Sequence, residues 1–483
     1  MRALDADKLY TADRRFLLLS SLLPIAGLAL AAFRLGGQSL WLDETYTWWF
    51  SRQGWGDLLQ AARIDAVNPP LYYFYVKLLA PSATEAALRL PSVLAYLGGV
   101  VGAIWLGFLL GGRPGGIAAG LLWATHPMSL WAARDARPYA LSAFLAVAGA
   151  VLFVRLQRSW STPLGLLAGF AIALGLLTHY FFFVLVASLV LVAGIDLRRS
   201  PVFFRRWTLV ALLGSVPLFI WLAWLLSTGS PSLGIGWIRT PVLADIPLTI
   251  WNLASGYGGI AGIPSTVLGT TVLFLAGAGL SSSRSAWLRS LLAGVLIPIL
   301  AVWTVSQRRP VYVDRYFIVL LPSVVSLVAL GAADFCRSTL RRETVPAGKY
   351  ASVTVACLAA LAAALTVHMA AKFQKEDWRS LATFLHSRTI GAESLSLSEP
   401  EIALPLSYYF DSGLMTQRPR LIPDCGDSCW WVLRQPYTAT HALSQSVREP
   451  RSVEALAIPD LCQAMDSWVS ETGVTAIHVV CSR

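Results

Sequence analysis

The sequence predicts an all-α, multi-pass membrane protein of about eleven transmembrane helices, followed by a small C-terminal α/β domain outside the membrane. Three observations predict this class. The 483 residues are 56% hydrophobic and only 13% charged, about half the charged share of an average soluble domain. The mean hydropathy is +0.60. Apolar stretches recur along residues 1–370 and are missing from residues 371–483, the tail. This pattern excludes a soluble enzyme, a disordered protein and a small disulfide scaffold.

The apolar stretches predict the individual spans. A hydrocarbon core of about 30 Å needs about 20 apolar residues per helix. The stretches that approach this length are 15–35, 87–111, 114–132, 138–154, 163–178, 180–196, 207–227, 264–280, 288–305, 315–335 and 350–370. With the N-terminus in the cytoplasm, every inside loop carries arginine, as the positive-inside rule requires. Eleven crossings then place the tail outside.

Charge and cysteine content support this topology. Residues 1–370 carry 28 Lys and Arg against 14 Asp and Glu, whereas the tail carries 10 against 13. Cations interleaved with apolar spans fit anionic lipid headgroups and not nucleic acid. The tail contains an even set of cysteines, which suits disulfides in an oxidising compartment, with the pairing open. These are Cys425, Cys429, Cys462 and Cys481.

Shorter elements are expected outside the spans. The outer segment 36–86 contains Leu71–Ser82, which is too short to cross and follows two prolines, so an interfacial or re-entrant helix is expected. Helical periodicity over 53–63 predicts a second helix lying flat on the membrane. In the tail, Lys375–Arg388 reads as an amphipathic helix. Residues 394–398 and 475–480 read as strands of the small α/β domain.

An acidic pair opens the first outer segment. Asp43 and Glu44 follow the first span within SLWLDETYTWW. A carboxylate held against Trp and Tyr at an interface is partly desolvated, which makes it a better base. The alternative is a solvated pair of loop acids. A divalent metal at Asp43 and Glu44 is a weaker possibility, because two carboxylates without a nearby His are an incomplete ligand set.

Cations on the outer face need an explanation, since the positive-inside rule depletes them there. Arg134 and Arg137 lie between the third and fourth spans, and Arg315 lies before the tenth. Arginine offers a planar fork that matches phosphate oxygens. The alternative is an interfacial cluster of snorkelling side chains. Asp65, beside a proline pair, is a second candidate acid, with an ordinary loop acid as its alternative.

Several short motifs occur in a characteristic order: WLDE, NPPLYY, ALRLPSVLAYLGG, RDARPYAL, THYF, DRYF and DWRSLATFL. Together they resemble the C-type (GT-C) glycosyltransferase superfamily. The chain is most similar to bacterial relatives of the protein O-mannosyltransferases and of the lipid A aminoarabinose transferases. The likeness covers about residues 15–390. The rest of the tail matches no family.

The resemblance implies a polyprenyl-phosphate-linked sugar donor and an active site on the outer face of a bacterial inner membrane. It implies that Asp43 is the general base of an inverting transfer and that Glu44 orients Asp43 or the acceptor. It implies no required cofactor. The family often has His or Lys where this chain has Asn68, so phosphate binding passes to Lys77, Arg134, Arg137 and Arg315. The candidates for acceptor or sugar binding are Asp65, Asn68, Tyr139, His179, Tyr180 and Tyr316.

The expected function is therefore an inverting glycosyltransferase that moves a sugar from a polyprenyl-phosphate donor to a hydroxyl of an envelope glycan, glycolipid or protein. Two alternatives come from other classes. A transporter or flippase for a lipid-linked glycan would place polar residues at mid-bilayer depth, and the spans are nearly free of them. A non-catalytic envelope assembly protein would use the tail as a binding module and would tolerate loss of the Asp43 carboxylate.

Overall fold

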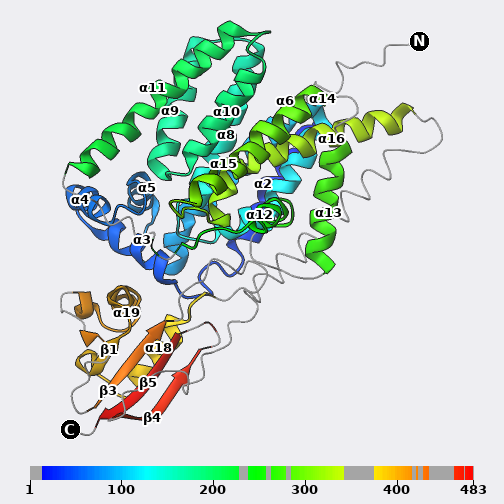
Figure 1. The fold of residues 1–483 in the computed structure, drawn as a ribbon. Helices are drawn as coiled ribbons and strands as arrows, with labels where there is room; N and C mark the ends of the chain where they lie inside the picture. Colours follow the sequence, from blue (N-terminus) through cyan, green and yellow to red (C-terminus); the bar gives the residue numbers. More distant parts are fainter. Residues whose placement is uncertain are drawn as a thin grey trace.

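The computed structural model describes most of the chain. The described residues are 14–227, 236, 238–256, 263–278, 284–341, 375–415, 420–421, 428–434, 462–470, 472 and 474–481. They form a bundle of helices that stands above a small sheet-containing tail (Figure 1). The predicted span 350–370 lies outside the described residues, so the count of about eleven crossings stays a prediction.

The bundle contains the apolar helices that the sequence predicts. Its principal helices are α2 (Arg14–Ala32), α6 (Glu85–Thr125), α7 (Pro127–Ala133), α8 (Tyr139–Arg158), α9 (Thr162–Thr178), α10 (Phe182–Ile195), α11 (Pro201–Leu226), α13 (Ile263–Ala278), α14 (Arg284–Leu291), the π-helical turn η1 (Leu292–Leu296), α15 (Ile297–Ser306), the 3₁₀ segment η2 (Asp314–Leu320) and α16 (Leu321–Arg341). Within the described ranges, six helical stretches are long and apolar enough to cross a membrane. The shorter apolar helices lie in 162–178, 182–195 and 266–278.

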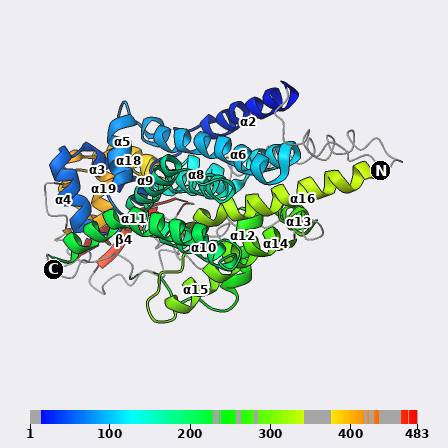
Figure 2. The same cartoon turned by 90° about the horizontal axis from the view of Figure 1, so that it is seen from above.

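Helix α6 is a hairpin of two spans. The two halves meet at Gly112, whose φ of 64° and ψ of −154° are not helical. Beyond this point the chain turns back on itself. The close approach of Gly120 to Ile104 shows this: a Cβ built on Gly120 would lie 2.3 Å from the Ile104 side chain. In a single straight helix these residues would be about 24 Å apart. The break falls between the predicted spans 87–111 and 114–132. Figure 2 shows α16 beside this hairpin, and α6 also packs against α2 and α8.

Three short helices cover the end of the bundle that faces the tail. These are α3 (Leu42–Arg52), α4 (Trp55–Asp65) and α5 (Leu71–Leu79). The last two confirm the helices predicted within 53–63 and 71–82. Two prolines precede α5 and deny it backbone donors at its start. Helix α12 (Asp245–Ser255) lies between the predicted spans 207–227 and 264–280, where no element was predicted.

The tail contains a five-stranded mixed sheet with strand order β2-β1-β3-β5-β4. The strands are β1 (Leu395–Leu397), β2 (Arg420–Leu421), β3 (Ser428–Arg434), β4 (Cys462–Val469) and β5 (Val474–Cys481). Strand β1 pairs in parallel with β2 and β3, and β5 pairs antiparallel with β3 and β4. The predicted strands 394–398 and 475–480 correspond to β1 and β5. Strands β2, β3 and β4 were not predicted. Cys429 in β3 is disulfide-bonded, as expected for the tail.

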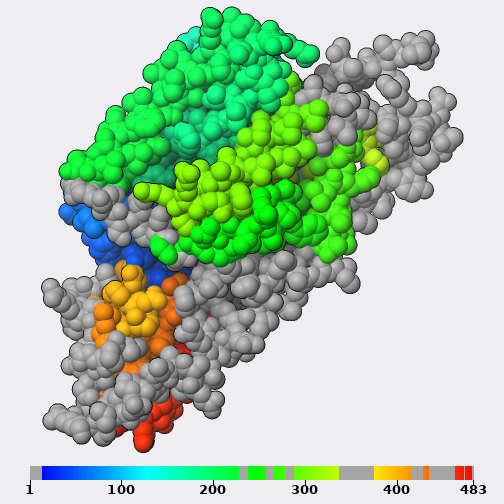
Figure 3. All heavy atoms as spheres, in the orientation of Figure 1, coloured from blue at the N-terminus to red at the C-terminus, as the bar shows by residue number. Residues whose placement is uncertain are grey.

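Two helices complete the tail: one packs on its sheet, and the other contacts the bundle. Helix α18 (Trp378–Ser387) is the predicted amphipathic helix, and its buried Trp378 and Leu381 pack with β1 and β3. Helix α19 (Ala403–Tyr409) contacts α3. The Tyr408 hydroxyl donates to the Ala83 carbonyl at 2.6 Å. Figure 3 shows the orange surface of the tail directly below the blue surface around α3.

Candidate active site

The acidic pair begins a helix. Asp43 and Glu44 lie in the first turn of α3, where carboxylates interact favourably with the positive end of the helix dipole. The tail supplies the missing cap. An oxygen of Glu376, just before α18, accepts a hydrogen bond from the Leu42 backbone N–H at 3.0 Å. The Glu376 backbone carbonyl accepts from the Ser39 hydroxyl. The segment that carries the pair is therefore fixed by the tail.

Glu44 is completely buried and paired on all sides. Its carboxylate receives the Arg89 guanidinium through two bonds of 2.7 and 2.8 Å. Lys375 Nζ lies 2.8 Å from Oε1, and the Ala136 backbone N–H donates to the same oxygen at 2.8 Å. Burial opposes ionisation, but Arg89 and Lys375 outweigh it and hold the pKa of Glu44 at about 2. Glu44 is an ionised structural anchor and is closed to solvent.

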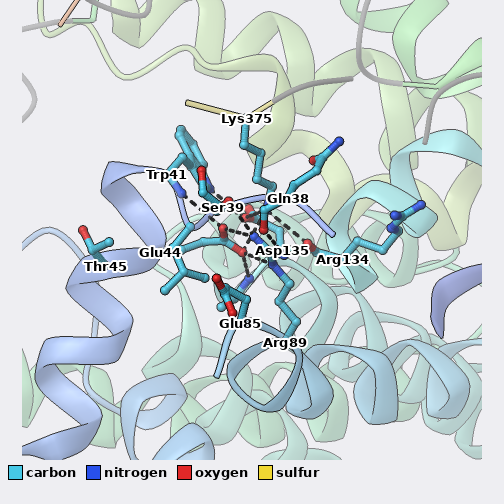
Figure 4. A network of polar contacts seen from close by, with 12 residues as sticks. Gln38, Ser39, Trp41, Glu44, Thr45, Glu85, Arg89, Arg134, Asp135 and Lys375 are labelled. Atoms are coloured by element: carbon cyan, nitrogen blue, oxygen red, sulfur yellow. Dashed lines mark hydrogen bonds and ion pairs between the residues drawn. The ribbon is translucent and has the colours of Figure 1, made fainter. Parts of the chain in front are cut away.

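Asp135 joins the same network. Its Oδ1 accepts from Trp41 Nε1 at 2.8 Å and from Lys375 Nζ at 2.9 Å. Burial raises the pKa of Asp135, and Lys375 opposes that rise. Figure 4 shows Lys375 entering from the tail between Glu44 and Asp135, while Arg89 approaches Glu44 from α6. Two carboxylates and two cations therefore neutralise each other in a buried network that joins bundle and tail.

Asp43 has a different environment from its neighbour. Its side chain is 24% exposed, and its Oδ2 lies 3.9 Å from an Arg137 Nη and 3.7 Å from an Arg315 Nη. Arg137 also donates to the Asp43 backbone carbonyl at 3.1 Å. Both guanidiniums are buried, at 6% and 3% exposure. Asp43 is thus an accessible carboxylate between two buried cations that lie beyond hydrogen-bonding distance of its oxygens.

Arg137 retains unused donor capacity. Among the described residues, no acceptor lies within hydrogen-bonding distance of its buried Nε. Burial opposes its charge, but Asp43 and neighbouring tyrosines hold the pKa of Arg137 above its usual range. A buried guanidinium with an unsatisfied N–H, beside one accessible carboxylate, is suited to an anionic ligand.

Aromatic rings surround Arg315. Its guanidinium lies 5.7 Å from the Trp41 ring centroid, 6.0 Å from that of Tyr139 and 5.8 Å from that of Tyr316. The His179 ring is 4.9 Å from Tyr316 and 5.8 Å from Tyr139. Burial, with Arg137 and Arg315, lowers the pKa of His179 to about 3, so this imidazole is neutral. The structure thus brings three of the predicted residues, Tyr139, His179 and Tyr316, together near the two arginines.

A pocket of about 390 Å³ opens between α3 and α4. Asp65, at the end of α4, lines it together with Tyr46 and Trp49. Burial raises the pKa of Asp65 to about 6, against the opposing effect of Arg137. Tyr180 is nearby, since its hydroxyl donates to the Ala66 carbonyl at 3.3 Å and accepts from the Trp221 indole. Asn68 is buried, and no partner of its Nδ2 is found in the described part of the chain.

Two predicted phosphate ligands lie elsewhere. Lys77 donates to the carbonyls of Ser51 and Gln53, at 3.2 and 2.7 Å, and so sits at the far end of α3 from Asp43. Eight residues of helix place that end about 12 Å from Asp43. The backbone carbonyl of Arg134 accepts a hydrogen bond from Lys375 at 3.1 Å. The Arg134 guanidinium points away from the buried network of Glu44, Asp135 and Lys375 (Figure 4).

Sequence reasoning missed Lys375, Glu376, Arg89 and Asp135. All four flank or lie within motifs that were recognised, ALRLPSVL, RDARPYAL and DWRSLATFL. A signal was present in Arg89, a cation inside an apolar span that needs a partner. Which partner it finds depends on long-range packing, because Glu44 is 45 residues away and Lys375 comes from the tail.

The described acidic side chains of the site do not form a metal-binding cluster. Within the described ranges, no group of three or more His, Cys, Asp and Glu side chains is placed to hold a metal ion. Asp43 and Glu44 do not present a shared ligand set, because both Glu44 oxygens are occupied by Arg89, Lys375 and the Ala136 N–H. Those contacts supply the positive charge that a metal would bring to Glu44.

Comparisons with known proteins address the fold. No protein-family model and no curated protein sequence matches this chain. The crystal structure of ArnT from Cupriavidus metallidurans in the apo state aligns over 96% of this chain and 97% of its own, with TM-score 0.59 and 13% identity. The chain has the fold of ArnT. The resemblance predicted from the motifs is thereby confirmed for the fold.

Two further structures are similar to this chain. ArnT from Cupriavidus metallidurans bound to undecaprenyl phosphate aligns over 96% of this chain and 97% of its own, with TM-score 0.56 and 13% identity. The oligosaccharyltransferase AglB from Archaeoglobus fulgidus, in complex with an inhibitory peptide and a dolichol-phosphate, aligns over 85% of this chain and 64% of its own. Its TM-score is 0.46 and its identity 12%.

Proposed function

We propose that this chain is an inverting glycosyltransferase that moves a sugar from a polyprenyl-phosphate donor to a hydroxyl acceptor at the outer face of a bacterial inner membrane. The observation that carries the proposal is the accessible Asp43 carboxylate between the buried guanidiniums of Arg137 and Arg315. The ArnT-like fold supports it, and one of the ArnT structures holds undecaprenyl phosphate.

In the proposed reaction, Asp43 is the base. Its carboxylate removes the proton of the acceptor hydroxyl, whose oxygen attacks the anomeric carbon of the donor sugar. The bond from that carbon to the phosphate oxygen breaks, and its electron pair leaves with the polyprenyl phosphate. A single displacement inverts the anomeric configuration. The exposure of Asp43 allows this contact, whereas the buried Glu44 has no access to substrate.

Arg137 and Arg315 neutralise the leaving phosphate. As the bond breaks, the departing phosphate gains one negative charge. It needs no proton, because two fixed cations already lie beside it and neutralise that charge. The unsatisfied Nε of Arg137 is available to one phosphate oxygen. Tyr139, Tyr316 and His179 border the same cations, and their ring faces suit the donor sugar. Lys77, on α5, lies beside the far end of α3 and does not take part.

Glu44 acts through position. Its ion pairs with Arg89 and Lys375 fix the first turn of α3, and Asp43 is the preceding residue in that turn. In this proposal, residues 1–370 form the catalytic membrane domain and residues 371–483 form an extracytoplasmic α/β domain. Lys375 and Glu376 complete the site from that second domain. No cofactor is needed for the proton transfer and displacement described.

The test compares cells that carry the wild type, a deletion and Asp43→Asn. Polyprenyl-phosphate sugars and envelope glycans are extracted and analysed by mass spectrometry. We expect one polyprenyl-phosphate sugar to accumulate and one glycan to lose a residue, equally in the deletion and in Asp43→Asn. Asp411→Asn, an exposed acid of the tail, is the control and should match the wild type.

A different outcome would contradict the proposal. If the deletion alters the envelope while Asp43→Asn, present at wild-type levels in the membrane, does not, then the chain acts by transport or binding. The acidic pair would then serve only to hold the loop against the tail.

A further inference from the structure

The pocket between α3 and α4 adjoins the proposed catalytic acid. Asp65 forms part of its wall, and both Asp43 and Arg137 are close enough to perturb the pKa of Asp65. Tyr46, on the turn of α3 that follows Asp43, also lines the pocket. An occupant in contact with Tyr46 would therefore lie about one helical turn from the carboxylate that removes the acceptor proton.

The lining combines flat rings with hydrogen-bonding groups. Trp49 and Tyr46 supply ring faces, and Gln60, Asp57 and Asp65 supply amide and carboxyl groups. Ring faces pack against the C–H surface of a pyranose, while carboxylates and amides bond its hydroxyls. A volume of about 390 Å³ holds one or two sugar rings. The chemistry of this wall matches a saccharide.

Charge is divided between the two sides of the site. Arg137 and Arg315 lie beside Asp43, whereas the lining of the pocket includes Asp57 and Asp65 and no Lys or Arg. Lys77, the nearby cation of α5, is directed to backbone carbonyls of α3 and to the Trp55 ring. A phosphate is attracted to the arginine side and repelled by the pocket.

We propose that the pocket between α3 and α4 is the acceptor subsite and that it binds an uncharged saccharide, discriminating against phosphorylated or acidic sugars. This inference rests on the proposed function, and it names the acceptor class. The hydroxyl that reacts belongs to a neutral glycan or to the neutral headgroup of a glycolipid, and a phosphorylated glycolipid is rejected by Asp57 and Asp65.

The test measures weak binding directly. The full chain in lipid nanodiscs is examined by saturation-transfer NMR with methyl α-mannoside, methyl β-galactoside, glucose 6-phosphate and glucuronate. We expect the two neutral glycosides to bind at least tenfold more tightly than the two anions at pH 7.5. A neutral glycosyl diacylglycerol in the nanodisc, used as competitor, distinguishes a glycolipid headgroup from a free glycan.

Variants assign the binding to the pocket. Trp49→Ala should abolish the neutral-sugar signal, and the double variant Asp57→Asn/Asp65→Asn should reduce discrimination against the anions to less than threefold. Trp55→Ala is the matched control, because Trp55 is exposed and lies against Phe74 outside the pocket lining. It should bind as the wild type does.

The outcomes separate this inference from the proposed function. Equal binding of neutral and anionic sugars, or binding unaffected by Trp49→Ala, overturns the inference, while the cellular Asp43→Asn experiment still decides the transferase. Neutral-sugar binding that persists in Asp43→Asn supports the inference, since Asp43 does not line the pocket. If Asp43→Asn also leaves the polyprenyl-phosphate sugars and envelope glycans of cells unchanged, the pocket is a saccharide site on a protein that is not a transferase.

Discussion

Lys375 offers the sharpest test of how the tail holds the acidic pair. Its ammonium group is 7% exposed and lies 2.8 Å from Glu44 and 2.9 Å from Asp135. Replacement by Met keeps the length of the side chain and removes the charge. Of the two buried carboxylates, only Glu44 would then still be paired with a cation, Arg89.

The magnitude follows from these distances. At an effective dielectric constant of about 20, a pair of unit charges about 2.9 Å apart attracts by about 6 kcal/mol. Desolvation of the ammonium offsets several kcal/mol of this for each ion. Removal of one partner from a buried pair costs about 3–5 kcal/mol in measured cases. We expect Lys375→Met to lose about 3 kcal/mol, because Glu44 keeps Arg89 and Asp135 keeps the Trp41 indole.

The assay is native-state hydrogen exchange of the full chain in nanodiscs, which gives the opening free energy of α3 and α18. The loss should be larger at pH 8 than at pH 5. Without Lys375 the pKa of Asp135 rises further, so protonation relieves the buried charge at low pH. Asp135→Asn in the Lys375→Met background should recover most of the loss.

The control is Arg388→Met. Arg388 pairs with Asp466 at 3.1 Å across the surface of the tail, with its side chain 55% exposed. Exposed pairs contribute about 0–1 kcal/mol, so this variant should change little. The reasoning is refuted if Lys375→Met costs no more than Arg388→Met, or if Asp135→Asn does not recover any of the loss.

Three further predictions follow from single residues. Arg137→Lys keeps the charge and loses the planar fork, so the KM for the donor should rise at least tenfold, as read from initial rates. Because the pKa of Asp65 is about 6, discrimination against glucuronate, whose own charge is constant above pH 5, should grow between pH 5 and pH 7, as Asp65 ionises; in Asp65→Asn, titrated by NMR, it should stay constant. Gly112→Ala should cost about 1–3 kcal/mol of unfolding free energy, since its φ is 64°, whereas Gly149→Ala, with open space around it, should not destabilise.

The fold was largely predictable because its determinants are local. Apolar length predicted the helices of the bundle, and the break between the predicted spans 87–111 and 114–132 coincides with the turn within α6. Proline pairs and amphipathic periodicity predicted α5 and α18. Strands β3 and β4 were missed, because their polar and apolar residues do not alternate cleanly. The pairing of β3 also depends on β5, which lies about 40 residues further along the chain.

The site was predictable only in part. Residue type and side of the membrane selected Asp43, Arg137 and Arg315, which the structure brings together. The same reasoning selected Lys77, and nothing local shows that its ammonium is directed to backbone carbonyls. The sequence also does not show that Asp43 and Glu44 have different environments. Adjacent helical residues face directions about 100° apart, and what each side chain then meets depends on tertiary packing.

The cap of α3 has a consequence for biosynthesis. The Leu42 N–H is bonded by a carboxylate 334 residues further along the chain. At a synthesis rate of about 5–20 residues per second, the ribosome needs roughly 20–70 s to add that carboxylate. During this interval the Asp43 turn, which the predicted topology places outside the membrane, lacks Glu376 and Lys375. In the proposed function, the site therefore stays incomplete until the last hundred residues of the chain have been added and have folded against α3.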